Sequence, residues 1–207
     1  TFPKSDNAHI ILDLVSGIYN YDGKNVWTVL RVENDSTITG FRQTSGWART
    51  RTVYFAITFS KPFKSYGYKD FEKSRIYKGF WRKFDQSKNF PEMAGTQMRA
   101  YFDFDTAQGE EILLKVAISP VSTDGALKNM AAEIPNWDFE KVKKEGQDIW
   151  NRELSKIEAE TTTEGEKVNF YTAMYHAFLS PTLYMDTDRQ YKGLDLNVHR
   201  AENFDNY

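Results

Sequence analysis

The chain has 207 residues, of which 40% are apolar and 15% aromatic, with a formal net charge of -2 and no cysteine. This composition can supply a packed core, and the near-neutral charge argues against a nucleic-acid-binding protein. The lack of cysteine excludes disulfides, thiol catalysis and cysteine-bound zinc. No run approaches the roughly 20 apolar residues of a membrane span, so no such span is expected.

The first half of the chain is a series of strand patterns separated by turns. An apolar run predicts a buried strand at residues 8–16, and alternation predicts further strands at residues 26–33, 36–42, 52–60, 98–104 and 111–119. Asp22-Gly23, between the first two strands, is typical of a β-hairpin. Strands at this spacing, with no helix between them, predict an antiparallel β-sandwich.

Three of these strands have a clear apolar face. The members of these faces are Val53, Phe55, Ile57 and Phe59; Met98, Ala100, Phe102 and Phe104; and Ile112, Leu114, Val116 and Ile118. Because side chains alternate along a strand, each set is expected to lie on one side of its sheet.

The pattern changes after Ser119, where helices are expected. Residues 125–134 read as a short helix or a loop, and Asp138 can cap a helix that runs to about Ile157. Thr163 and Glu166 have the spacing of a capping box, which predicts a helix that continues through residues 168–179. The predicted fold class is therefore mainly β with C-terminal helices.

The last predicted helix has two neighbouring apolar and aromatic stripes. Their members are Phe170, Met174 and Phe178 on one stripe, and Tyr171, Tyr175 and Leu179 on the other. A surface helix normally buries about a third of its circumference, so these stripes are too wide for one sandwich face. We expect this helix to be disordered, folded back on the sandwich, or packed against a second copy of the chain.

One tryptophan is a candidate for sugar binding. Gly46 precedes Trp47 and suggests a turn that could present the indole ring to a sugar, although a tryptophan in such a sequence lies more often in a core or an interface. The remaining tryptophans are expected in the core: Trp27, Trp81, Trp137 and Trp150.

No metal site is predicted in this chain. Asp186 and Asp188 suggest a calcium loop, but the residues that follow do not continue the EF-hand pattern, so a loop or a helix cap is expected. The three histidines are far apart in the sequence, which argues against zinc.

Several long stretches resemble the glycoside hydrolase family 92 α-mannosidases. They are residues 38–48 (ITGFRQTSGWA), 53–63 (VYFAITFSKPF), 116–135 (VAISPVSTDGALKNMAAEIP), 168–195 and 197–207 (NVHRAENFDNY). Members of this family are much longer and pair an N-terminal, galactose-mutarotase-like β-supersandwich with an (α/α) barrel. The resemblance therefore implies an internal fragment: part of the sandwich in residues 1–135, and a helical linker into the barrel in residues 136–207.

The resemblance also implies a function for the parent protein. The family consists of exported, calcium-dependent, inverting exo-α-mannosidases that act on mannose-rich glycans. An inverting glycosidase needs two carboxyl groups roughly 6.5–9.5 Å apart. In the family these groups, and most calcium ligands, belong to the barrel, which would follow Tyr207.

We therefore assign no catalytic residue and no metal ligand to this chain, and expect it to be inactive alone. Its partners would be mannose-rich glycans and the barrel of the same parent chain. The alternative is a stand-alone β-sandwich module that binds carbohydrate through exposed aromatic residues such as Trp47. A third possibility is a scaffold that supports the barrel and binds no sugar. No leader is visible, but removal of a leader and cutting from a longer chain would both leave a start without methionine, as here.

Overall fold

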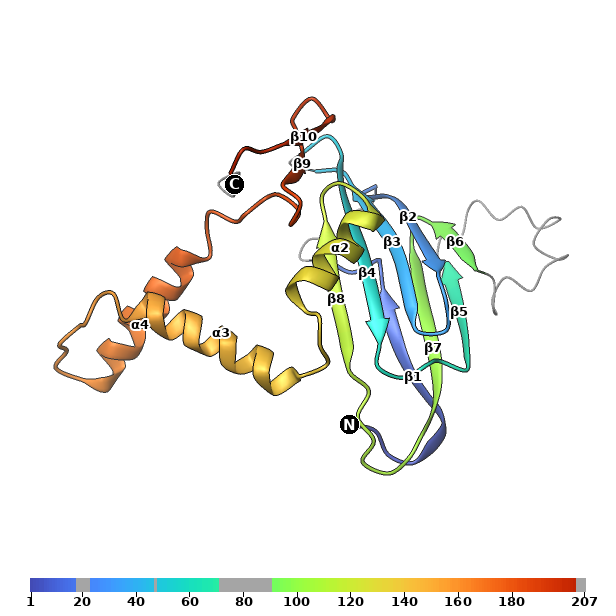
Figure 1. The fold of residues 1–207 in the computed structure, drawn as a ribbon, viewed down its shortest axis with the longest axis horizontal. Coiled ribbons are helices and arrows are strands. Elements are labelled where there is room, and N and C mark those ends of the chain that lie inside the picture. The colour runs from blue at the N-terminus through green and yellow to red at the C-terminus, as the bar shows by residue number, and fades with distance from the viewer. Residues whose placement is uncertain (18–22, 47, 71–90, 204–207) are drawn as a thin grey trace, which may run out of the picture.

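The computed structural model describes residues 1–17, 23–46, 48–70 and 91–203. Two antiparallel β-sheets stack face to face, one helix covers the outer face of the larger sheet, and two further helices form an arm (Figure 1). The predicted fold class, an antiparallel β-sandwich followed by helices, is confirmed.

The larger sheet has five strands in the order β6-β2-β3-β4-β8. They are β2 (Asn25–Val32), β3 (Thr37–Thr44), β4 (Arg51–Phe59), β6 (Glu92–Gly95) and β8 (Leu114–Ser119). The predicted apolar face of β4 is confirmed, because Phe55, Ile57 and Phe59 are buried in the core. Leu30 of β2 and Ile38 of β3 are fully buried beside them.

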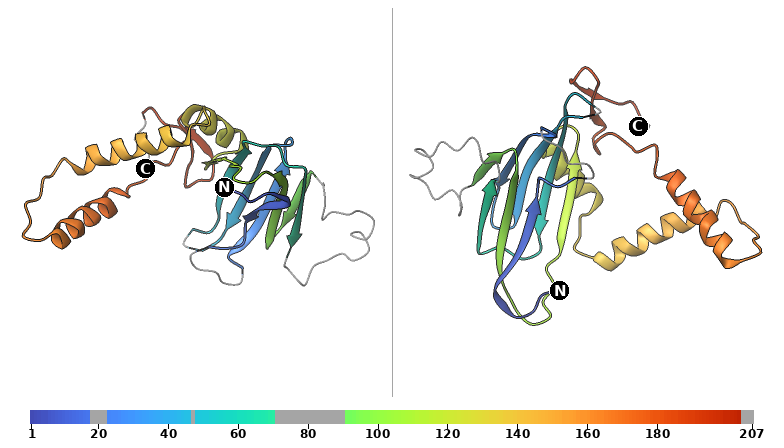
Figure 2. Two further views of the ribbon diagram at one scale, coloured as in Figure 1. Left: turned by 90° about the horizontal axis from the view of Figure 1, so that it is seen from below. Right: turned by 180° about the vertical axis from the view of Figure 1, so that it is seen from behind.

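The smaller sheet has three strands in the order β1-β7-β5 and stacks on one face of the larger sheet (Figures 1 and 2). They are β1 (Ser5–Asp13), β5 (Ser65–Asp70) and β7 (Met98–Thr106). The apolar face predicted for β7 is confirmed, because alternate residues from Met98 to Phe104 are buried. The ring centre of Phe59 lies 5.2 Å from that of Phe102, so aromatic packing holds the two sheets together.

The predicted hairpin at Asp22-Gly23 is wrong. β1 pairs with β7 in the smaller sheet, whereas β2 pairs with β3 and β6 in the larger one, so the chain crosses between sheets here. Gly23 has a φ of 82°, as a tight turn requires, and Asp22 lies outside the described residues. Turn chemistry identified the reversal of the chain but not the partner of the strand that follows.

Two strands are less buried than their apolar sequences predict. In β1 the side chains alternate, and Ile11 is exposed on the outer side of its sheet. On the predicted apolar face of residues 111–119, Ile112 is buried, but Leu114, Val116 and Ile118 are exposed.

Helix α2 (Thr123–Glu133) covers the outer face of the larger sheet at β4 and β8 (Figure 1). The side chain of Ser122 caps it by accepting a backbone N–H of the first turn. Ala126 and Met130 pack against Ala56 of β4 and Ala117 of β8. The stretch predicted as a helix or a loop is thus a helix with a small apolar core of its own.

Helices α3 (Phe139–Leu154) and α4 (Glu164–Phe178) form the arm. Both predicted starts are confirmed: Asp138 caps α3, and Thr163 and Glu166 form a capping box on α4. Neither helix has a buried residue, and both stand clear of the sandwich (Figure 2). The expectations of a disordered or folded-back α4 are therefore wrong, and packing against a second copy stays a prediction.

Side-chain contacts hold the two arm helices together. The ring centres of Trp150 and Tyr175 lie 4.6 Å apart, and the hydroxyl of Tyr171 donates a hydrogen bond to the carbonyl oxygen of Ile157 at 3.2 Å. The predicted domain boundary, between residues 135 and 136, lies in the link between α2 and α3.

The chain then returns toward α2 and forms a small hairpin of β9 (Gln190–Lys192) and β10 (Val198–Arg200) (Figure 1). None of the helices in the described ranges is long and apolar enough to cross a membrane.

Candidate functional site

Trp47, the candidate sugar-binding residue, lies outside the described residues, so its role stays a prediction. The backbone N–H of Gly46 donates a hydrogen bond to the carbonyl oxygen of Ala48 at 3.0 Å, directly after the end of β3.

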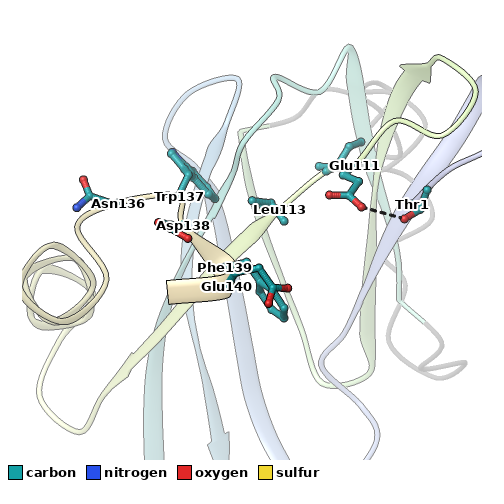
Figure 3. A pocket seen from close by; sticks show the side chains of 9 residues that line it. Thr1, Glu111, Leu113, Asn136, Trp137, Asp138, Phe139 and Glu140 are labelled. Carbon is teal, nitrogen blue, oxygen red and sulfur yellow. Dashed lines mark hydrogen bonds between the residues drawn. The ribbon is translucent and has the colours of Figure 1, made fainter. Parts of the chain in front are cut away.

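A groove of about 670 Å³ lies where the approach to β8 meets the start of α3 (Figure 3). We call it the α3 groove. Its lining residues are Thr1, Glu111, Ile112, Leu113, Asn136, Trp137, Asp138, Phe139 and Glu140. On one side the hydroxyl of Thr1 donates a hydrogen bond to Glu111 at 3.3 Å, and on the other side α3 begins.

The α3 groove combines aromatic and polar side chains. Trp137 is 40% exposed and Phe139 is 61% exposed, so both rings are open to solvent. The ammonium group of Lys115 lies 4.4 Å from the ring centre of Trp137 and donates a hydrogen bond to the carbonyl oxygen of Pro135 at 3.0 Å. Aromatic rings beside carboxylate and amide groups could stack on a sugar ring and bind its hydroxyls.

Exposure also corrects the prediction that the other tryptophans lie in the core. Trp27 and Trp137 are exposed, and Trp150 is half-buried against Tyr175. Trp81 lies outside the described residues. Trp137 directly precedes the predicted helix cap Asp138, and this local pattern did not indicate that the ring faces a groove.

A largely buried polar cluster lies between β8, α2 and the loop after α4. We call Ser119, Asn129, Asp186 and Thr187 the junction cluster. Asp186 is only 2% exposed, and its carboxylate accepts hydrogen bonds from the Ser119 hydroxyl at 2.7 Å and the Asn129 amide at 2.8 Å. The amide oxygen of Asn129 accepts the backbone N–H of Thr187 at 2.9 Å. The loop after α4 is therefore fixed to the sandwich and to α2.

Gly125 provides the space for this cluster. A Cβ atom at this position would lie 2.3 Å from the carboxylate of Asp186 and 2.6 Å from the hydroxyl of Ser119. The sequence placed Asp186 in a loop or a helix cap and missed these partners. They lie 57 and 67 residues away in the chain, and no local spacing points to them.

The tip of the β9–β10 hairpin contains a second carboxylate with defined partners. Both oxygens of Asp195 lie within 3.0 Å of Nε2 of His199, and the Asn197 side chain donates a hydrogen bond to one of them at 3.0 Å. These hydrogen bonds lower the pKa of Asp195 from 3.8 to about 2. The pair is exposed and fixes the shape of the hairpin tip.

The described residues do not by themselves fit a calcium site. Calcium takes six to eight oxygen ligands, often from several carboxylates. In the ranges that the structure describes, no three His, Cys, Asp or Glu side chains come together. Asp186 is bound by Ser119 and Asn129, while Asp188 lies 3.1 Å from the amide of Gln190 and 3.4 Å from Lys128.

Two family models match the chain. Residues 1–119 match the glycosyl hydrolase family 92 N-terminal domain, and residues 125–207 match the glycosyl hydrolase family 92 catalytic domain. The junction cluster connects the two matched regions, because Ser119 ends the first and Asn129 and Asp186 belong to the second.

Solved enzymes share this fold. A family GH92 α-mannosidase from Bacteroides thetaiotaomicron is 37% identical with a TM-score of 0.82, over 97% of this chain and 26% of that chain. A family GH92 inverting mannosidase from Bacteroides thetaiotaomicron VPI-5482 has a TM-score of 0.77 at 24% identity, over 97% of this chain and 25% of that chain. The chain thus spans about a quarter of the length of these two enzymes.

A curated relative points the same way. An uncharacterized secreted glycosidase from Arthroderma benhamiae is 30% identical over 95 residues, which are 44% of this chain and 12% of that protein. The N-terminal domain model alone matches more than half of the chain, and the catalytic domain model matches most of the remainder. The chain belongs to glycosyl hydrolase family 92.

Proposed function

We propose that this chain is the sandwich and linker of an exported, calcium-dependent, inverting exo-α-mannosidase that acts on mannose-rich glycans. The observation that carries the proposal is the 37% identity to a family GH92 α-mannosidase over 97% of the chain. A structure of that enzyme contains mannoimidazole. The secreted glycosidase among its relatives supports export of the parent protein.

In this proposal the chemistry belongs to the (α/α) barrel of the same parent chain. Inversion needs an acid and a base with room for water between them, and a calcium site needs several oxygen ligands. No carboxylate pair in this chain is assigned to either task. The contribution of the chain is structural: the junction cluster fixes the approach to the barrel, and the exposed apolar side chains of α3 and α4 would pack against it.

Activity of the parent protein tests the proposal. Purified parent protein should release mannose from an aryl α-mannoside, lose activity with a chelator, and recover it with calcium. Nuclear magnetic resonance should show the β-anomer of mannose as the first product. Residues 1–207 alone should give no turnover. Chelator-sensitive turnover by residues 1–207 would overturn the assignment of the chemistry to the barrel, and α-mannose as the first product would overturn inversion.

The second candidate function is a carbohydrate-binding module. The α3 groove favours it, because Trp137 and Phe139 present exposed rings beside polar groups. Calorimetry of residues 1–207 with mannose oligosaccharides tests it, with Trp47→Ala and Trp137→Ala as separate variants. Binding that one variant abolishes, while the circular dichroism spectrum is unchanged, would support the module and locate its site. No heat of binding would favour the scaffold.

A further inference from the structure

Strand β8 has an apolar face that belongs to the inside of the sandwich. In the pairing of β4 with β8, Phe55 lies opposite Ile118, Ile57 opposite Val116, and Phe59 opposite Leu114. Residues directly opposite each other in an antiparallel pair point to the same side of the sheet. Because Phe55, Ile57 and Phe59 are core residues, the β8 stripe of Leu114, Val116 and Ile118 also faces inward.

The β8 stripe is nevertheless open to solvent. Leu114 is 41% exposed, Val116 is 53% exposed and Ile118 is 63% exposed. The reason lies in the strand counts: the described part of the chain forms five strands in the sheet that contains β8 and three in the sheet that faces it. Among the described residues, β7 of the smaller sheet packs on β4, where Phe59 meets Phe102, but the β8 stripe stays uncovered. Exposed apolar residues in a row on the core side of a sheet indicate a missing layer.

In the part of the chain that the structure describes, the smaller sheet ends at the place where this layer is missing. Figures 1 and 2 show β1 at the side of its sheet that is nearest to β8. Phe2, ahead of β1, bridges to Glu110, ahead of β8, so the segments that lead into the two strands lie side by side. Within the described ranges β1 pairs only with β7, so its other edge has backbone groups that can pair with a further strand.

We propose that the β8 stripe and the free edge of β1 together receive a β-strand from another part of the same parent protein. This strand extends the smaller sheet beyond β1, and its inward side chains are apolar and pack on Leu114, Val116 and Ile118. The chain covers about a quarter of its solved relatives, so a parent of that size contains further sequence that can supply the strand. The proposal does not depend on mannosidase activity.

A strand fits both features, whereas other occupants fit only one. A helix would cover the β8 stripe but leave the backbone groups of β1 unpaired. A glycan would need hydroxyl-binding groups, and the stripe itself is entirely aliphatic. The stripe also continues the existing core without a gap, because its members lie directly beside Phe55, Ile57 and Phe59.

Cysteine labelling tests the proposal, since the chain has no cysteine of its own. Val116→Cys is compared with Asp35→Cys, at an exposed position in the β2–β3 turn, in residues 1–207 and in a parent protein whose other cysteines are serine. In residues 1–207 both thiols should react at similar rates. In the parent, Val116→Cys should react roughly 100-fold more slowly, because a buried thiol reacts only when the structure opens locally, and Asp35→Cys should be unchanged.

Three outcomes would overturn the proposal. They are full reactivity of Val116→Cys in the parent, protection in residues 1–207 that grows with protein concentration, and protection that appears only with a mannose oligosaccharide. The second would assign the surface to another copy of the chain, and the third to a glycan. Hydrogen exchange on the unaltered proteins covers the case of a variant that does not fold. Amides of β1 should exchange more slowly in the parent, and equal rates would refute strand pairing.

Discussion

The sandwich and the arm both carry large apolar side chains, but only the sandwich buries them. Leu30, Ile38, Phe102 and Phe104 have no exposed surface, whereas α3 and α4 contain no buried residue. The arm helices begin at clear capping residues, and they contact each other through a few side chains. The difference shows that local sequence is enough to start and end a helix, while burial depends on distant parts of the protein.

The largest difference between the two regions should appear when an aromatic ring is removed. Phe102→Ala should lower the free energy of unfolding by about 3–5 kcal/mol, because its ring is fully buried against Phe59 and Phe63. Phe139→Ala should cost less than about 0.5 kcal/mol, because that side chain is 61% exposed. Urea denaturation followed by circular dichroism measures both.

Equal effects of these two substitutions would contradict the contrast between sandwich and arm. If Phe102→Ala does not fold, Phe102→Leu serves instead. It should cost less than Phe102→Ala but more than Phe139→Ala, since it removes part of a buried ring.

Two glycines in helices offer a matched pair. Gly125→Ala in α2 should destabilise the protein by about 1–3 kcal/mol, because the new methyl group would overlap buried atoms of Asp186 and Ser119. Gly146→Ala in α3 should stabilise its helix by up to about 1 kcal/mol, because its Cβ would meet nothing within 4 Å. Thermal denaturation of both variants measures the difference. Stabilisation by Gly125→Ala would show that the junction cluster moves aside without cost.

The capping box should matter only to the arm. Thr163→Ala removes the side chain that accepts the backbone N–H of Glu166, which should cost α4 about 1 kcal/mol. Hydrogen exchange in residues 164–178 should become faster, while the melting temperature of the sandwich stays the same. Thr163→Ser, which keeps the hydroxyl, should behave like the natural chain. A lower sandwich melting temperature in Thr163→Ala would show that the two regions are coupled.

The smallest expected effect is that of low pH on two carboxyl groups, Asp195 in the C-terminal hairpin and Asp13 at the edge of the sandwich. The pKa of Asp195 lies at about 2, below its ordinary 3.8, so its ionised form stabilises the hairpin above pH 3.8 and this contribution is lost toward pH 2. For Asp13 of β1, burial raises the pKa, but hydrogen bonds led by that from Arg99 outweigh burial and hold the pKa well below its ordinary range.

Carboxyl carbon titration by nuclear magnetic resonance checks these shifts. Both carboxyl groups should titrate below their ordinary range, and His199→Ala should raise the pKa of Asp195, because it removes the largest cause of the shift. An unchanged pKa in His199→Ala would contradict the assigned cause.

The sequence predicted those features of the fold that depend on residues close together in the chain. The alternating faces of β4 and β7, the cap at Asp138 and the capping box at Thr163 depend on spacings of a few residues, and the structure confirms them. The family resemblance, which depends on long stretches, is also confirmed.

The sequence did not predict those features that depend on contacts between residues far apart in the chain. Asp22-Gly23 gave the turn but not the sheet that each flanking strand joins. The pattern of β8 gave an apolar face, but whether that face is covered depends on strands elsewhere. The junction cluster was missed because Asp186 meets Ser119 and Asn129 only after the chain has passed through the arm and returned.

The junction cluster also determines where this protein can be cut or recombined. The family models divide the chain between residues 119 and 125, yet Ser119 lies on one side of that division and its buried partner Asp186 on the other. A chimera joined there would take Ser119 from one enzyme and the loop around Asp186 from another. A workable chimera takes β8, α2 and the loop around Asp186 from the same enzyme. The segments that must be exchanged together are therefore not contiguous in the sequence.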